Sequence, residues 1–84
     1  MTHRTITFYT RRNCHLCDSA RYVLERVVAS RPDVTVEYVD IDDDPALRRR
    51  YTDDVPVILL DGVEWARHRL DANKLRAALG APPD

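Results

Sequence analysis

Long apolar runs and an excess of charge of one sign are both missing from this chain. No uninterrupted apolar stretch reaches the roughly 18 residues that suggest a membrane-spanning helix. The formal net charge is −1 over 84 residues, so no strong electrostatic field attracts the protein to nucleic acid or to an anionic membrane surface. We therefore expect neither a membrane nor nucleic acid among its partners.

The start of the chain lacks the continuous apolar stretch of a secretory signal peptide. Polar and apolar residues alternate there instead, from residue 5 to residue 9. The chain also has no internal repeat or linker, and its length suits one small domain over residues 1–84. We expect a monomeric, cytoplasmic protein, in a compartment where a disulfide is usually transient or catalytic.

Cysteine is scarce as well: Cys14 and Cys17 are the only two, and two residues separate them. A β-rich run precedes the pair and a helical pattern follows at once, which would place both cysteines at a helix start. Free backbone N–H groups and the helix dipole stabilise an anion there, so Cys14 should be the more acidic and nucleophilic sulfur. Cys17 lies about one helical turn further on, where it can attack a mixed disulfide formed by Cys14. We interpret the pair as a redox-active dithiol, with Cys14 as nucleophile and Cys17 as resolving cysteine.

The cysteine pair has two other interpretations: half of a zinc site, or two unrelated cysteines in a small core. Structural zinc sites usually contain clustered pairs of ligands. This chain has no second Cys-x-x-Cys and no closely spaced pair of histidines, so His3 and His68 would have to complete such a site. We expect no bound metal.

The spacing of apolar residues predicts four strands and three helices. The strands are expected at residues 5–9, 34–39, 57–60 and 63–66. One helix should follow the cysteine motif and end near residue 30, before Pro32. A second, short helix should begin in the segment Asp42-Asp43-Asp44-Pro45, with an aspartate as its cap. The last helix should be capped by Asp71 and ended by Gly80.

The order of these elements predicts the fold class. A strand, a helix and a second strand in succession indicate a right-handed parallel crossover. Asp61 and Gly62 predict a tight hairpin, so that the third and fourth strands run antiparallel. We expect an α/β fold of order βαβαββα, with a four-stranded mixed sheet flanked by helices.

This order, together with four short segments, resembles the glutaredoxin branch of the thioredoxin fold over almost the whole chain. The segments are Tyr9-Thr10-Arg11, the dithiol motif, Val39-Asp40-Ile41-Asp42 and Asp54-Val55-Pro56, the last matching a Thr-Val-Pro segment of the family. The resemblance implies a thioredoxin-like fold in which Pro56 is cis and lies beside the cysteine pair. It also implies that the Val55 backbone offers hydrogen bonds to an extended substrate segment, while Pro56 shapes the groove.

Two departures from glutaredoxins concern the active site. His15 and Leu16 stand between the cysteines, where glutaredoxins carry Pro-Tyr. The family's Gly-Gly pair, where backbone approaches the γ-glutamyl end of glutathione, is replaced by residues 65–69, including Arg67. The sequence is similar to a group of small glutaredoxin-like proteins with Cys-x-Leu-Cys. Because side chains replace open backbone at this position, we expect weak use of glutathione.

Three more residues are candidates for substrate binding. Arg11 carries a permanent charge that is placed to stabilise the Cys14 thiolate or to bind a substrate carboxylate, although it could also be a solvated loop residue. Tyr9 either lines the site or is a half-buried core residue at a strand end. Arg67 either pairs with a carboxylate of a small thiol or belongs to a solvated loop. His15 is a weaker candidate for tuning Cys14 electrostatically.

These features predict a glutaredoxin-like thiol–disulfide oxidoreductase. Its partners would be a disulfide-containing protein or a small mixed disulfide, and a reducing thiol or reductase. The cycle needs no bound cofactor, but a low-molecular-weight thiol, glutathione or another, is a candidate co-substrate. Two alternatives from other classes stay open: an iron–sulfur cluster or metal carrier that uses Cys14, and a binding module that kept the fold while its chemistry lapsed.

Overall fold

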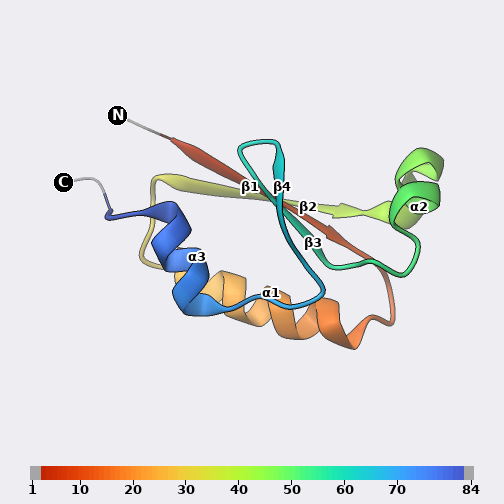
Figure 1. The fold of residues 1–84 in the computed structure, drawn as a ribbon, viewed down its shortest axis with the longest axis horizontal. Helices are drawn as coiled ribbons and strands as arrows, with labels where there is room; N and C mark the ends of the chain where they lie inside the picture. Colours follow the sequence, from red (N-terminus) through yellow and green to blue (C-terminus); the bar gives the residue numbers. More distant parts are fainter. Residues whose placement is uncertain (1–2, 83–84) are drawn as a thin grey trace.

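A computed structural model describes residues 3–82 of the chain (Figure 1). A short 3₁₀ turn, η1, covers Ile41–Asp43. The other elements are, in chain order, β1 (Arg4–Thr10), α1 (His15–Val28), β2 (Val34–Asp40), α2 (Pro45–Tyr51), β3 (Val57–Leu60), β4 (Val63–Arg67) and α3 (Ala72–Leu79). The predicted order βαβαββα is confirmed.

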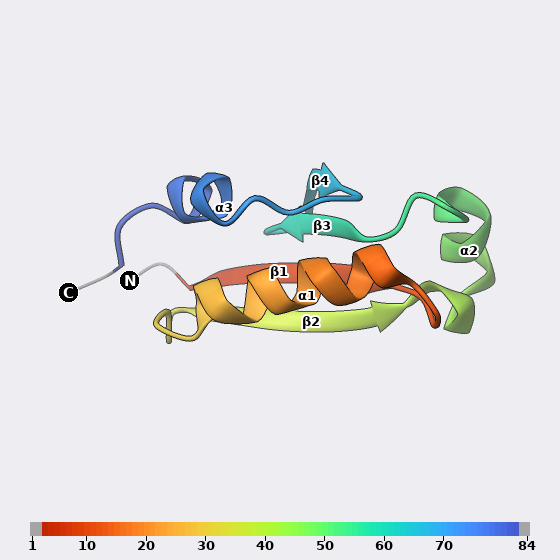
Figure 2. The ribbon, with the colours of Figure 1, turned by 90° about the horizontal axis from the view of Figure 1, so that it is seen from below.

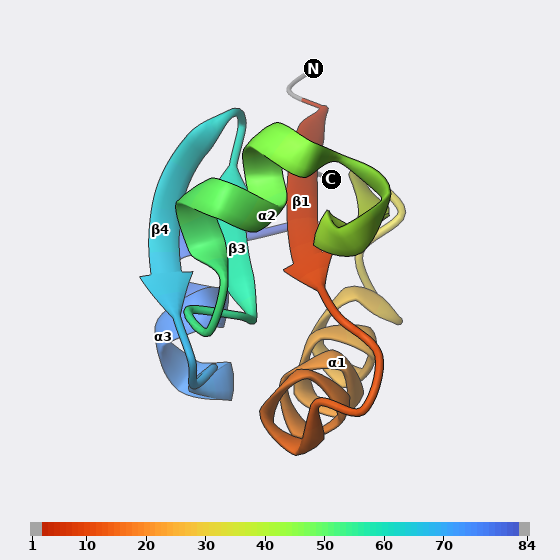
Figure 3. The ribbon, with the colours of Figure 1, turned by 90° about the vertical axis from the view of Figure 1, so that its right-hand side faces the viewer.

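The four strands form one mixed sheet in the order β2-β1-β3-β4. β1 and β2 are parallel, while β3 is antiparallel to both β1 and β4 (Figure 2). Helices α1 and α3 lie on the same face of the sheet, and α2 lies at the end of the sheet where β1 and β2 finish (Figure 3). The predicted mixed sheet flanked by helices is therefore confirmed as well.

The main core lies between the sheet and the helices α1 and α3. Side chains alternate along β1, so Ile6 and Phe8 are fully buried on this face. Helical spacing brings Ala20, Leu24 and Val27 of α1 against them. Burying a side chain as large as Leu24 stabilises the fold by about 1.5–3 kcal/mol relative to leaving it exposed. The core is completed by Ile58, Leu75 and Leu79.

Aspartates cap α2 and α3, as the sequence predicts. The Asp44 side chain accepts a hydrogen bond from the Ala46 N–H at 2.9 Å, and Pro45 occupies the first position of α2. The Asp71 side chain accepts a hydrogen bond from the Lys74 N–H at 3.0 Å. Each cap satisfies a backbone N–H that the helix itself leaves without a partner.

Asp61 and Gly62 form the predicted hairpin between β3 and β4. Both have positive φ, 50° and 86°, as a two-residue hairpin turn with right-handed strand twist requires. Asp61 has a second role that the sequence did not indicate: its carboxylate accepts hydrogen bonds from the Thr5 N–H (2.9 Å) and from Arg4 Nε (2.6 Å). These bonds tie the hairpin to β1 and hold the pKa of Asp61 below its usual range.

A buried ion pair organises the turn between α1 and β2. Helix α1 ends at Val28, two residues before its expected end, and the Arg31 N–H then donates to the Val28 carbonyl at 2.9 Å. Arg31 binds both oxygens of Asp33, at 2.9 and 2.8 Å, and donates to the Gly80 carbonyl at 2.7 Å. The turn is thereby joined to the end of α3. The hydrogen bonds from Arg31 lower the pKa of Asp33.

This ion pair predicts a pH-dependent loss of stability in Asp33→Asn. The variant leaves the nearly buried Arg31 guanidinium without its charged partner, so we expect a melting temperature lower by several degrees at neutral pH. Because the folded-state pKa of Asp33 lies below its unfolded value, the carboxylate stabilises the fold above the unfolded value of about 3.9. That stabilisation disappears as pH falls through the folded-state pKa.

Thermal unfolding followed by circular dichroism over acidic to neutral pH measures the effect. Asp53→Asn, which removes an exposed carboxylate, is the control and should change the melting temperature little. A difference between Asp33→Asn and wild type that stayed constant down to strongly acidic pH would contradict the electrostatic explanation.

Candidate functional site

Cys14 and Cys17 lie at the start of α1 and form a disulfide, with their Cα atoms 5.2 Å apart. Cys14 is the N-cap residue, and its Sγ accepts a hydrogen bond from the Cys17 N–H at 3.1 Å. Because α1 begins at His15, the Cys14 sulfur belongs to the N-cap residue and Cys17 lies in the first turn of the helix. Cys14 is partly exposed, whereas Cys17 is 1% exposed. An incoming thiol or disulfide can therefore reach Cys14 but not Cys17.

A second, smaller core lies directly beneath this disulfide. Residues distant in sequence meet here, because the end of β1, the start of α1, the start of β3 and the helix α2 converge at one end of the sheet (Figure 3). Tyr9 packs against it, with its ring 5.2 Å from the ring of Tyr51. Tyr9 therefore supports the site from below. The buried members of this cluster are Cys17, Ile41, Tyr51, Val55 and Val57.

Val55 lies in the same cluster, and the peptide bond between Val55 and Pro56 is cis, which confirms the isomer implied by the resemblance. Both residues are buried. The Pro56 carbonyl accepts a hydrogen bond from the His68 N–H at 2.8 Å. The end of β4 is thus attached to the segment that packs beside the disulfide.

Arg11 binds other parts of the protein. Its guanidinium makes two contacts with the Asp42 carboxylate, at 3.0 and 3.2 Å, and donates to the Thr52 carbonyl at 2.9 Å. The loop before the cysteines is thereby joined to both ends of the η1–α2 region. The sequence places Asp42 at a helix start and in one of the segments that carry the resemblance, but does not indicate that it binds Arg11. The role of Arg11 toward a thiolate stays a prediction.

Arg67 also has carboxylate partners. It binds both oxygens of Glu64, at 2.7 and 3.0 Å, and one oxygen of Asp54 at 3.3 Å. His68 Nε2 lies 3.2 Å from the other oxygen of Asp54. Hydrogen bonds from Arg67 hold the pKa of Glu64 below its usual range.

A β-bulge brings Glu64 and Arg67 together. Ile58 pairs with Ala66 and Leu59 pairs with Glu64, so that Trp65 is an extra residue in β4. Without this extra residue, positions three apart in a strand would point to opposite faces. Simple alternation in the sequence could not have revealed this pair.

The described residues show neither a metal centre nor a membrane-spanning helix. Within residues 3–82, no group of three or more histidine, cysteine, aspartate or glutamate residues is arranged to hold a metal ion. None of the helices in that range is both long enough and apolar enough to span a bilayer. His15 is exposed beside Cys14.

The fold and the dithiol site define a thioredoxin-fold protein with a Cys-x-x-Cys disulfide, an arrangement that supports thiol–disulfide oxidoreductase chemistry in general. Residues 5–80 match the family model of the Glutaredoxin-like domain (DUF836). The chain belongs to this family, so the resemblance inferred from the sequence is confirmed.

Other proteins resemble this chain along most of its length. An uncharacterized protein of Mycobacterium tuberculosis is 32% identical, and the match covers 100% of this chain and 96% of the relative. The solution structure of protein XcR50 from X. campestris is 38% identical, with a TM-score of 0.72 over 93% of this chain and 95% of that one. Oxidized mitochondrial thioredoxin 3 of Saccharomyces cerevisiae is 17% identical, with a TM-score of 0.66 over 93% and 77% of the two chains. This last likeness concerns the fold alone.

The position of Cys14 predicts an acidic thiol once the disulfide is reduced. The Cys17 N–H and the start of α1 both favour a negative charge on Cys14 Sγ. In Cys17→Ser we therefore expect the pKa of Cys14 to lie below that of a free cysteine. The rate of alkylation by iodoacetamide, followed against pH, reports this value as the midpoint of its rise.

The same measurement on urea-unfolded Cys17→Ser is the control, because the helix start is then lost. A midpoint in the folded protein equal to or above that of the unfolded protein would contradict the stabilisation of the thiolate.

Proposed function

We propose that this protein is a dithiol thiol–disulfide oxidoreductase that acts on a disulfide-containing protein or a small mixed disulfide in the cytoplasm. The observation that carries the proposal is the Cys14–Cys17 disulfide at the start of α1, with Cys14 partly exposed and Cys17 buried. Buried, inert cysteines of a purely structural kind would not present one sulfur to solvent at a helix N-terminus.

The proposed cycle begins with the reduced dithiol. The Cys14 thiolate attacks one sulfur of the substrate disulfide, a mixed disulfide forms, and the other substrate sulfur leaves as a thiolate. Cys17 then loses its proton and attacks Cys14 Sγ, which forms the Cys14–Cys17 disulfide and releases the second substrate thiolate. Two electrons have passed from the protein to the substrate. An external thiol or reductase restores the dithiol, and no bound cofactor takes part.

The residues around the disulfide would assist in distinct ways. Val55 would hydrogen-bond an extended substrate segment through its backbone, and the neighbouring Pro56, which has no N–H, would shape the groove. Tyr9 would hold the floor of the site through its packing against Tyr51. The Arg11–Asp42 pair would fix the loop that precedes Cys14.

The two cysteines should behave differently when each is replaced. Cys17→Ser keeps the nucleophile but cannot resolve the mixed disulfide, so it should trap a disulfide substrate covalently. Cys14→Ser leaves only the buried sulfur and should trap none. Mass spectrometry after incubation with a glutathionylated peptide and with an oxidised protein substrate measures the adducts.

The double variant Cys14→Ser/Cys17→Ser is the control for adducts at other positions. Equal trapping by both single variants would show that the assigned roles are wrong. Absence of any adduct on Cys17→Ser, with either substrate, would overturn the proposed function.

Glutathione should be a poor substrate. The Arg67 side chain stands where glutaredoxins have open backbone, and Glu64 and Asp54 already occupy its guanidinium. An exposed ion pair contributes only about 0–1 kcal/mol. Replacing these partners of Arg67 by a glutathione carboxylate would therefore add little binding free energy. We expect turnover of a glutathionylated mixed disulfide to be markedly slower than that of an ordinary dithiol glutaredoxin assayed beside it.

Arg67→Gly tests the steric part of this argument and should raise the turnover. Arg49→Gly, an exposed arginine on α2, is the matched control and should not. Wild-type turnover comparable to that of the ordinary glutaredoxin would refute the expectation.

A further inference from the structure

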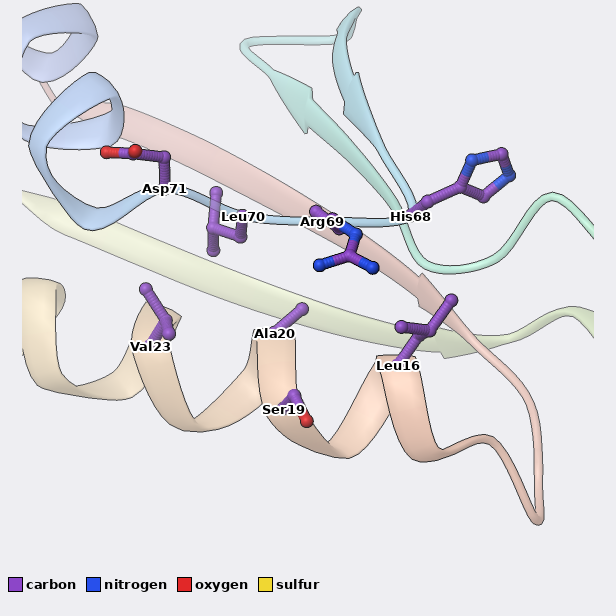
Figure 4. Close-up of a pocket in the computed structure, with 8 residues that line it drawn as sticks. All are labelled: Leu16, Ser19, Ala20, Val23, His68, Arg69, Leu70 and Asp71. Atoms are coloured by element: carbon purple, nitrogen blue, oxygen red, sulfur yellow. The ribbon is translucent and has the colours of Figure 1, made fainter.

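A groove of about 380 Å³ runs along α1, on the side that faces residues 68–71 between β4 and α3 (Figure 4). Leu16, Ala20 and Val23 line it from α1, and Arg69 and Leu70 line it from the opposite side. Leu16 is the neighbour of Cys17 in the chain, so this end of the groove lies near the disulfide, although neither cysteine lines it. The groove therefore offers a surface to whatever is bound to Cys14.

The length of the groove suits an extended peptide. Leu16 and Val23 are seven residues apart on α1, which corresponds to about 10 Å along the helix axis. An extended chain covers this distance with about three residues. The groove could therefore hold the residues next to a substrate cysteine.

The lining of the groove is mainly apolar. Leu16 is 44% exposed, while Val23 and Leu70 are partly exposed. These side chains lie on facing sides of the groove (Figure 4). An apolar side chain of a partner that packed between Val23 and Leu70 would remove both from water.

One positive charge is directed into the groove. The Arg69 guanidinium points toward α1, whereas the His68 ring points away from it (Figure 4). In the described part of the chain, Arg67 and His68 are paired with carboxylates but Arg69 has no ion-pair partner. Asp71 also lines the groove, but its carboxylate caps α3 through the Lys74 N–H. The groove therefore favours a negatively charged group beside Arg69.

We propose that this groove binds an extended segment of a protein substrate that carries an apolar side chain and a carboxylate next to its disulfide-bonded cysteine. The proposal rests on the proposed function. The carboxylate pairs with Arg69 beside Leu16, and the apolar side chain packs further along the groove, between Val23 and Leu70 (Figure 4). Glutathione supplies carboxylates but no apolar side chain to cover Val23 and Leu70, so a protein segment matches the groove better.

Binding can be measured without any redox step. Cys14→Ser is titrated at low salt into fluorescein-labelled peptides whose single cysteine is S-methylated, with fluorescence anisotropy as the readout. Each peptide carries Leu and Glu, placed either before or after the cysteine. For comparison, one matched peptide has Gln in place of Glu, and another has Ala in place of Leu. For at least one placement, we expect the Leu–Glu peptide to bind about twofold to fivefold more tightly than its Gln counterpart, the range of an exposed ion pair.

Arg69→Gln in the same background should remove this preference for Glu over Gln. Arg69→Glu should reverse the charge preference, so that a peptide with Lys in place of Glu binds more tightly than the Leu–Glu peptide. Arg67→Gln is the matched control: it removes an equal charge two residues away and should leave the preference for Glu over Gln in place. Equal loss of the preference in the Arg67 and Arg69 variants would overturn the assignment to Arg69. Equal binding of Glu and Gln peptides in every placement, or no gain from Leu over Ala, would overturn the proposed occupant.

Competition separates glutathione from a protein segment. S-methylglutathione should displace the Leu–Glu peptide much less effectively than the unlabelled peptide does. Displacement that is equally effective, and that depends on Arg69, would assign the groove to the small thiol instead. If wild-type protein reduces no disulfide at all, the proposed function fails, whereas the anisotropy result still decides whether the groove binds this class of segment.

Discussion

The hydrogen bond between the Cys17 N–H and Cys14 Sγ, at the first turn of α1, is the interaction on which the site depends. A sulfur atom takes the capping position that aspartates occupy in the other two helices. The disulfide is therefore part of the secondary structure and does not merely project from it. The same geometry buries Cys17 in the smaller core while Cys14 stays accessible. Packing beneath the helix start thus separates the two sulfurs into different environments.

Charges around the site are largely neutralised within the protein. Asp42 binds Arg11, and Glu64 and Asp54 bind Arg67. The sequence suggested that Arg11 and Arg67 could bind a thiolate or a substrate carboxylate. In the structure, these carboxylates of the protein hold both arginines in fixed positions. This pairing reduces the attraction that the site offers to a small anionic thiol, because a ligand must compete with carboxylates already in place. Arg69 differs, since it points into the groove beside Leu16.

Much of the fold could be predicted because its signals are local. Alternation identified the strands, and the third strand was predicted at its observed boundaries, residues 57–60. Asp44, Asp71 and the Asp61-Gly62 pair marked turns and helix starts through their own backbone preferences. Other features could not be predicted, because they involve partners that are distant in the sequence. The bond from Arg31 to the Gly80 carbonyl and the Asp54–Arg67 contact are of this kind.

The sequence by itself determined the order of elements and the reactive groups of the site: two cysteines at helical spacing after a strand, and a Val-Pro segment before the third strand. It did so because reactive groups and local backbone preferences belong to short stretches of chain. Only the tertiary structure decided which sulfur is exposed, which arginines are neutralised and where an open groove remains. Exposure and ion pairing depend on which distant segments pack together. The bulge at Trp65 illustrates this, since one extra residue in β4 turns Glu64 and Arg67 to the same face.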